Sequence, residues 1–448
     1  MKKIKFLILL IIFLLLVVSC SNGTKDVHRQ SDKQKEITIM LTDNDYDWVK
    51  ERAESLINCK LWFEQERGVN INFDIITANN DDEYDKKKNT KLYLSDGPTL
   101  IFISSFDSYK NYIEQGIAVD VNGKIPNFEK VYSGVLDDEG YFIPIGMDYW
   151  PTILNKSVID RLGLDKPKPN WTRNDYLEMK EMSLKLEPQY FTRSEYFELL
   201  VPRLNEIDVL DEENKTISLN NQKVIQCIKE VRKEIFSDKY IRNENYTYEN
   251  FYNMIFERES DENKESSDLE KYIENKRLKS AYPRTRSGLK SLEVDTIIND
   301  NSIILPDVIY GENDIFHTWG FIVNSNGKNI ELGMEFINEL LEHDNQLEMF
   351  TQEYSTYPVN KEIEDEISKI EEEKGINEEA IELRKYLINQ IELGNYERYH
   401  SSRKKLELQS KLYLDFVEYV FADVPYTDEE LSGELQKLET KYRIWLNE

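Results

Sequence analysis

The apolar positions in the first hundred residues alternate between the spacing of strands and that of helices. Three short runs, Glu36–Leu41, Val69–Ile75 and Leu100–Ile103, are apolar throughout or at every second position, which predicts β-strands. Between the first two runs, apolar residues recur at helical spacing over residues 47–67, and Gly68 ends that stretch. The order strand, helix, strand, helix, strand predicts a parallel sheet with right-handed crossovers.

The remainder of the chain is dominated by helical patterns. Tyr141–Gly146 and Ile303–Pro306 are short apolar runs that predict two more strands. Thr172 is followed three residues later by Asp175, a pair that is typical of a helix N-cap. Further helices are predicted over 224–236, 247–257 and 362–390 and after Thr427, and the charged stretch 258–276 is predicted to be a surface excursion.

The N-terminal segment has the order of charged and apolar residues that an export signal requires. Lys2, Lys3 and Lys5 precede an unbroken apolar run over 6–18. A membrane-spanning helix needs about 20 apolar residues, so this run is too short to span a bilayer comfortably. No second run of that kind follows in the chain.

The end of the apolar run carries a second signal. Val17-Val18-Ser19-Cys20 resembles the lipobox of bacterial lipoproteins, and a polar stretch follows at once. The resemblance implies removal of the signal peptide 1–19, lipid attachment at Cys20 and a flexible tether over 20–35. The protein would then lie on the extracellular face of the bacterial cell membrane, with the lipid as its only membrane contact. An ordinary signal peptide with an incidental cysteine is the alternative.

Composition adds limits to this interpretation. The 448 residues suggest two or more domains, since single cores usually stop growing near 250 to 300 residues. A net charge of −28 disfavours nucleic acid as a partner. Cys59 and Cys227 are predicted to be buried free thiols, with a disulfide as the alternative. The four histidines have no metal-ligand spacing, and no cofactor or metal is expected.

Several short motifs follow one another in a distinctive order. A Tyr-x-Ile-Pro strand leads to an Asn-Lys pair, a Leu-Gly-Leu and a Trp-Thr helix start, in the segments Tyr141–Gly146, Leu154–Lys156, Leu162–Leu164 and Pro169–Thr172. This order resembles that of the extracellular solute-binding proteins of ABC importers, of the maltose- and oligosaccharide-binding type. Further segments that resemble this family are Asp96–Leu100, Gly116–Asp120, Trp319–Ser325 and Tyr357–Lys361.

This resemblance implies a two-lobed α/β fold like that of periplasmic binding proteins, with ligand in a cleft and a hinge between the lobes. It also implies a monomer that captures a sugar or oligosaccharide and delivers it to the transmembrane subunits of an ABC permease. The implied bounds are 36–144 plus 318–357 for the first lobe, 150–305 plus 362–448 for the second, and 145–149, 306–317 and 358–361 for three hinge crossings.

The loop after the first strand is one candidate for ligand contact. Ligands of open α/β sheets lie beyond the carboxyl ends of the strands, which selects Asp43 and Asp45 as acceptors for sugar hydroxyls. With Asp47 and Glu54, these residues also match part of a calcium-loop pattern, although Trp48 replaces the required glycine. The third interpretation is that the carboxylates cap the first helix.

Other candidates follow later strand ends and the crossings. Ser104, Ser105, Phe106 and Asp107 follow the third strand and offer hydrogen bonds and a stacking face, or a helix cap. Aromatic side chains stack on the apolar faces of sugar rings. The candidates of that kind at the hinge are Tyr149, Trp150 and Trp319, the last within His317-Thr318-Trp319, with core packing as the alternative for each.

No catalytic motif accompanies these residues. The sequence contains no Gly-x-Ser-x-Gly, no His-Glu-x-x-His and no phosphate loop, which favours binding over catalysis. Two other functions stay open as alternatives. One is a surface-anchored enzyme that processes glycosides, and the other is a ligand-sensing or adhesin lipoprotein with the same fold.

Overall fold

The computed structural model describes most of the chain from residue 35 onward. The export signal, Cys20 and most of the tether lie outside the described residues. So do the predicted helix over 247–257, the stretch 258–276, and the candidates Ser105, Phe106 and Asp107. The described residues are 35–78, 81–104, 109–136, 139–191, 193–207, 209–211, 215–241, 277–279, 287–299, 301–309, 315–399 and 403–447.

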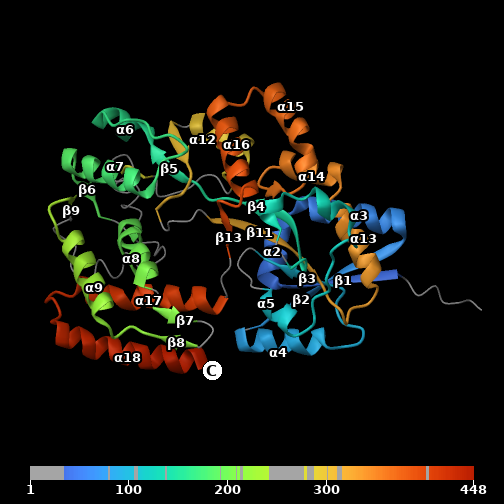
Figure 1. Cartoon of the computed structure of the whole chain (residues 1–448), viewed down its shortest axis with the longest axis horizontal. Helices are drawn as coiled ribbons and strands as arrows, with labels where there is room; N and C mark the ends of the chain where they lie inside the picture. The colour runs from blue at the N-terminus through green and yellow to red at the C-terminus, as the bar shows by residue number, and fades with distance from the viewer. Residues whose placement is uncertain are drawn as a thin grey trace, which may run out of the picture.

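A seven-stranded sheet organises the first lobe (Figure 1). The parallel pairing predicted for the first three strands is confirmed, with β1 between β2 and β3. β11 then runs antiparallel to both β3 and β4 and carries the chain back into the sheet. The strands are β1 (Lys35–Thr42), β2 (Val69–Ile76), β3 (Leu100–Ile103), β4 (Phe142–Asp148), β11 (Ile315–Val323), β12 (Tyr357–Pro358) and β13 (Glu397–Arg398).

Helices cover both faces of this sheet because its strands are apolar on both sides. Ile39 and Leu41 belong to a core with α2, α3, α13 and α14, whereas Met40, between them, faces a smaller core with α4 and α5. These helices are α2 (Asp43–Arg52), α3 (Glu54–Arg67), α4 (Asp81–Leu92), α5 (Lys110–Glu114), α13 (Ile330–Leu340) and α14 (His343–Thr351), with short 3₁₀ turns η1 (Pro126–Lys130), η2 (Ser133–Val135) and η4 (Lys361–Ile363).

The first helical stretch differs from its prediction. The structure has two helices where one was expected over 47–67, because the backbone of Ala53 leaves the helical region with φ −133° and ψ 47°. The first of them also begins earlier, at Asp43, since Thr42 serves as its N-cap. By contrast, the predicted capping box of Thr172 and Asp175 at the start of α7 (Arg173–Leu186) is confirmed.

The second lobe is mainly helical (Figure 1). β5 and β10 pair antiparallel beside α6, α7 and α12, and a separate core joins α8, α9, α17 and α18. Cys59 and Cys227 are buried and free, as predicted. The elements are β5 (Thr152–Asn155), α6 (Lys156–Leu162), β6 (Gln189–Tyr190), α8 (Arg193–Ile207), β7 (Leu210–Asp211), β8 (Thr216–Ile217), α9 (Gln222–Ile235), β9 (Tyr240–Ile241), α12 (Ser291–Asn299), β10 (Ser302–Leu305), α17 (Arg403–Phe421) and α18 (Asp428–Asn447).

Two helices that were predicted to belong to the second lobe pack at its boundary with the first. α15 (Glu364–Lys374) and α16 (Glu378–Glu392) contribute to a core that includes both the helices of the first sheet and residues of α12 and β10. Arg384 is fully buried there and forms ion pairs with Glu364 at 2.6 Å and Glu371 at 2.7 Å. This shared core does not divide the helices between the lobes, and the lobe boundaries stay a prediction.

Within the described part of the chain, no helix has the length and apolar character needed to cross a bilayer.

Candidate ligand-binding site

Three segments that are far apart in sequence meet where the chain leaves the first sheet. The end of β4 pairs with the start of β11, so that Asp148 lies opposite His317, and β13 pairs with the other edge of β11 at Phe316. Figure 1 shows these strands in the middle of the molecule, between the two lobes. These strand ends therefore lie where the chain passes between the lobes.

An aromatic row of Trp150, His317 and Tyr399 occupies this junction. The Trp150 ring centroid lies 4.3 Å from that of His317, which lies 5.0 Å from that of Tyr399. His317 is buried, whereas Trp150 is 49% exposed. A half-exposed aromatic surface held by a buried neighbour suits stacking on the apolar face of a sugar ring. We call these three residues the crossing aromatic row.

Tyr149, beside this row, has a different environment. Its side chain is buried, its ring stacks on Tyr396 with centroids 5.6 Å apart, and its hydroxyl accepts the N–H of Asp307 at 2.7 Å. Asp307 belongs to the returning crossing, so Tyr149 joins two crossings to each other. Its contacts are those of a structural residue that supports the neighbouring Trp150.

Trp319 lies in the core of the first lobe. It is 1% exposed, and its Nε1–H donates to the hydroxyl of Thr356 at 2.9 Å. Its ring packs against Trp48 and Phe102, with centroids 5.5 and 5.8 Å away. Of the two alternatives for Trp319, the structure favours core packing over ligand contact, because the surrounding rings cover it on several sides.

The two aspartates after β1 differ from each other. Asp45 is buried and completes a capping box, since its carboxylate accepts the hydroxyl of Thr42 at 2.6 Å and the backbone N–H of Thr42 at 3.2 Å. Asp43 is exposed and accepts the N–H of Asn44 at 3.0 Å. The capping interpretation therefore accounts for Asp45. No group of residues that could hold a metal ion is found in the described part of the chain, so the calcium alternative gains no support.

Ser104 is the described member of the group after β3. It is half-buried directly beyond the end of β3. Its role as a ligand contact stays a prediction, as do the roles of the three residues that follow it.

Buried charges lie directly behind the aromatic row. Arg52 of α2 reaches Asp148, two residues before Trp150, with 3.2 Å between Nη2 and Oδ2. Burial raises the pKa of Asp148 to about 7, against the opposing effect of the Arg52 charge. A carboxyl group with that pKa titrates near neutral pH, unlike an exposed aspartate.

Sequence reasoning missed two members of this junction. Tyr399 lies in 362–448, where the chain carried no recognisable motif, and Arg52 reaches a partner 96 positions away. His317 was noted only as a neighbour of Trp319. Tyr399 follows the short strand β13 (Glu397–Arg398), which the sequence analysis did not predict.

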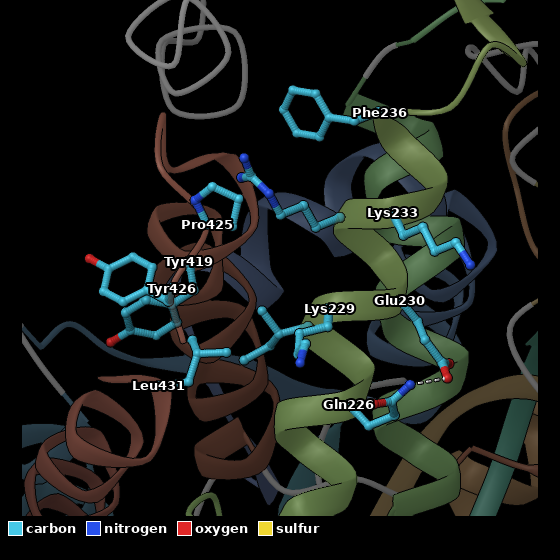
Figure 2. A pocket seen from close by; sticks show the side chains of 11 residues that line it. Gln226, Lys229, Glu230, Lys233, Phe236, Tyr419, Pro425, Tyr426 and Leu431 are labelled. Atoms are coloured by element: carbon cyan, nitrogen blue, oxygen red, sulfur yellow. Dashed lines mark hydrogen bonds between the residues drawn. The ribbon is translucent and has the colours of Figure 1, made fainter. Parts of the chain in front are cut away.

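A groove on the outer part of the second lobe is a weaker candidate (Figure 2). It lies between α9 and the segment that links α17 to α18, and it exposes Phe236 and Tyr426 beside several cations. Lys229 pairs with Asp428 at 2.6 Å, and Arg232 donates to the backbone oxygen of Val420 at 2.6 Å. Because Lys229 and Arg232 already have internal partners, the groove offers less charge for a ligand than its composition suggests.

Comparison with known proteins supports the fold assignment. No protein-family model and no curated protein matches the sequence. Solved structures match over nearly the whole chain. An ABC substrate-binding protein of Listeria monocytogenes in complex with cycloalternan has a TM-score of 0.52 at 13% identity, covering 91% of this chain and 98% of its own. The maltose-bound protein MalE3 of T. maritima has a TM-score of 0.51 at 13% identity, covering 90% and 99%.

The chain has the two-lobed fold of ABC substrate-binding proteins. A third match, the bacterial solute receptor AcbH with preference for β-D-galactopyranose, gives a TM-score of 0.56 at 12% identity and covers 93% of this chain and 99% of its own. These identities are too low to transfer a ligand, but the fold places the crossing aromatic row at the junction between two lobes. The predicted fold class is thereby confirmed.

Proposed function

We propose that this protein is the lipid-anchored, extracellular solute-binding component of an ABC importer, and that it captures a sugar or oligosaccharide between its lobes. The observation that carries the proposal is the half-exposed ring of Trp150 at the junction of the lobes, which lies against His317, itself packed on Tyr399. The similar proteins from Listeria monocytogenes and T. maritima hold cycloalternan and maltose. Their ligand class agrees with the aromatic surface found here.

The proposed mechanism depends on enclosure of the ligand between the two lobes. A sugar that stacks on Trp150 and is covered by both lobes loses its contact with water, so each hydrogen bond to it becomes stronger. Because the ligand contacts both lobes only when they are closed, it shifts the population toward the closed form. A permease that recognises the closed form would then receive mainly loaded protein.

A panel of sugars tests the ligand class. A ligand that binds only the native state increases the free energy of unfolding, by about 2.7 kcal/mol at a ligand concentration of a hundred times Kd, and so raises the melting temperature. We expect maltose, galactose or a longer or cyclic glucose oligosaccharide to raise it, while the same sugars stay chemically unchanged on prolonged incubation. Stabilisation by peptides or polyamines alone would contradict the sugar assignment, and conversion of a sugar to products would favour the glycoside-processing alternative.

The lipid anchor is a separate part of the proposal with its own test. Cysteine at position 20 supplies the thiol for lipid attachment, and the segment 20–35 would let the lobes turn near a permease. We expect Cys20→Ala to release the protein from the membrane fraction into the medium. Cys59→Ala is the matched control, because Cys59 is buried in α3 and carries no anchor. Firm membrane association of the Cys20 variant would contradict the anchor.

A further inference from the structure

Four charged side chains are enclosed where β4 leaves the first sheet. Arg52, Asp148 and Lys290 are 7%, 6% and 1% exposed, and the side chain of Glu293 is 16% exposed. They come from α2, from β4, from the segment before α12 and from α12. Burial of charge is costly unless the charges pair, and here two cations face two anions. We call these four residues the hinge charge cluster.

Contacts within the cluster run across the crossing. Arg52 Nη2 lies 3.2 and 3.4 Å from the two carboxylate oxygens of Asp148. Lys290 Nζ lies 3.9 Å from Glu293 Oε1 and donates to the backbone oxygen of Gln352. The cluster thus joins the helices over the first sheet to the segment that leads into α12.

The backbone strengthens this connection. The N–H of Gly288, between Ser287 and Lys290, donates to the backbone oxygen of Tyr149 at 2.7 Å. Arg52 lies in the predicted first lobe, whereas Lys290 and α12 lie in the predicted second lobe, and α12 packs on β10. A rotation of one lobe about β4 would therefore change the distances within the cluster.

The cluster is not fully satisfied in this arrangement. Arg52 Nε is buried without a hydrogen-bond partner among the residues that the structure describes. A buried polar atom of this kind favours access of water. A rotated arrangement that admits water to the cluster would satisfy Arg52 Nε and would compete with the arrangement described here.

The two arrangements would differ in how tightly their charged groups bind protons. Burial raises the pKa of Asp148 to about 7 and lowers the pKa of Lys290 to about 8. In a hydrated arrangement the pKa of Asp148 would return toward its ordinary value near 3.9. The arrangement in which Asp148 has the higher pKa binds its proton more tightly, so for this group lowering the pH favours the enclosed form and raising it toward 7 favours the hydrated form. Lys290 acts in the opposite direction, but only above about pH 8, where it begins to lose its proton in the enclosed form.

We propose that the hinge charge cluster is a proton-sensitive lock, in which Asp148 is a positioning residue that holds the lobes in the arrangement described here and keeps Trp150 against His317. The proposal rests on the proposed function only in treating the crossing aromatic row as the ligand site. The charged and titratable groups that face Asp148 are Arg52 from α2, Lys290 and Glu293 from the segment entering α12, and His317 across β4 and β11.

The test uses the Cys20→Ala variant of the full chain, without ligand, at pH values from roughly 5.5 to 8.5. Fluorescence of Trp150, taken as the difference from a Trp150→Phe variant, and the radius of gyration from X-ray scattering should both change in one transition near pH 7, with the larger radius at high pH. We expect Asp148→Asn to abolish the transition and keep the small radius. His317→Gln and Asp165→Asn, an exposed control, should retain it.

Two outcomes would overturn the lock. One is a transition that persists in Asp148→Asn, and the other is a transition that His317→Gln removes, since His317 would then be the titrating group. If Asp148→Asn does not fold, Lys290→Met serves instead. Loss of that cation should move the midpoint to higher pH, and an unmoved midpoint overturns the proposal. No sugar enters these measurements, so failure of the ligand assignment would leave their result intact, and the reverse also holds.

Discussion

Two aromatic clusters lie on β11, two residues apart, and only one of them has the properties of a binding surface. Trp319 is enclosed by other rings, and its Nε1–H donates a hydrogen bond to Thr356. Both the apolar face and the polar group of this side chain are therefore in contact with other protein atoms. Trp150 rests on His317 with half of its surface exposed. The comparison shows that the exposed area of an aromatic ring, rather than the residue type, identifies the candidate site.

The difference arises from position along the strand. His317 and Trp319 are separated by one residue and so project toward the same side of β11. Trp319 lies deep in the sheet, where Trp48 of α2 covers it, while His317 lies at the end of the strand, where β4 departs toward the second lobe. The position of each residue along β11 therefore determines whether its side chain is buried in the core or available to the candidate site.

The strongest test compares truncation in the two clusters. We expect Trp319→Ala to lower the free energy of unfolding by about 3–5 kcal/mol, the usual effect of removing a large buried aromatic side chain. Trp150→Ala should lower it by less than about 1 kcal/mol, since half of the ring is already in water. Chemical denaturation of both variants measures this, and equal losses would erase the distinction.

The pH dependence of stability tests whether the region behind Trp150 differs from the dry core around Trp319. In the folded protein the pKa of Asp148 is raised to about 7, so the native state holds a proton that the unfolded state releases above about pH 4. The contribution of Asp148 to stability is therefore largest below that pH and falls as the pH rises toward 7, by roughly 4 kcal/mol at most.

Asp148→Asn should remove this fall, and denaturation curves at several pH values measure the difference from the unsubstituted protein. Asp165→Asn provides the control, because Asp165 is exposed. A fall of unchanged size in Asp148→Asn would mean that another group titrates.

Ligand affinity tests the functional half of the comparison. Once a sugar is found, Trp150→Ala should weaken its binding at least ~10-fold, which corresponds to about 1.4 kcal/mol. Trp62→Ala is the matched control, since Trp62 on α3 is 45% exposed but lies away from the crossing. Titration calorimetry measures both variants. An equal loss in Trp62→Ala, or none in Trp150→Ala, would remove the crossing aromatic row from the site.

The comparison also shows which features of the fold and the candidate site could be predicted from the sequence. Strands β1 to β4 of the first sheet and the cap formed by Thr172 and Asp175 were predictable, because apolar periodicity and helix capping depend on residues close in sequence. The exposure of Trp150 and the burial of Trp319 were not, because both depend on how distant elements pack. Tyr399 joins the row only through pairing of β13 with β11, which no local pattern encodes.

The smallest expected effect concerns the helix cap that was first considered a ligand site. Thr42→Ala removes the hydroxyl that accepts the N–H of Asp45 at 3.0 Å and should lower the free energy of unfolding by about 1 kcal/mol. Sugar affinity should stay unchanged, because the carboxylate of Asp45 is turned toward its own helix start rather than toward Trp150. Calorimetry and denaturation of the same variant separate these effects. A loss of affinity without a loss of stability would return Asp45 to the binding site and extend that site beyond the crossing aromatic row.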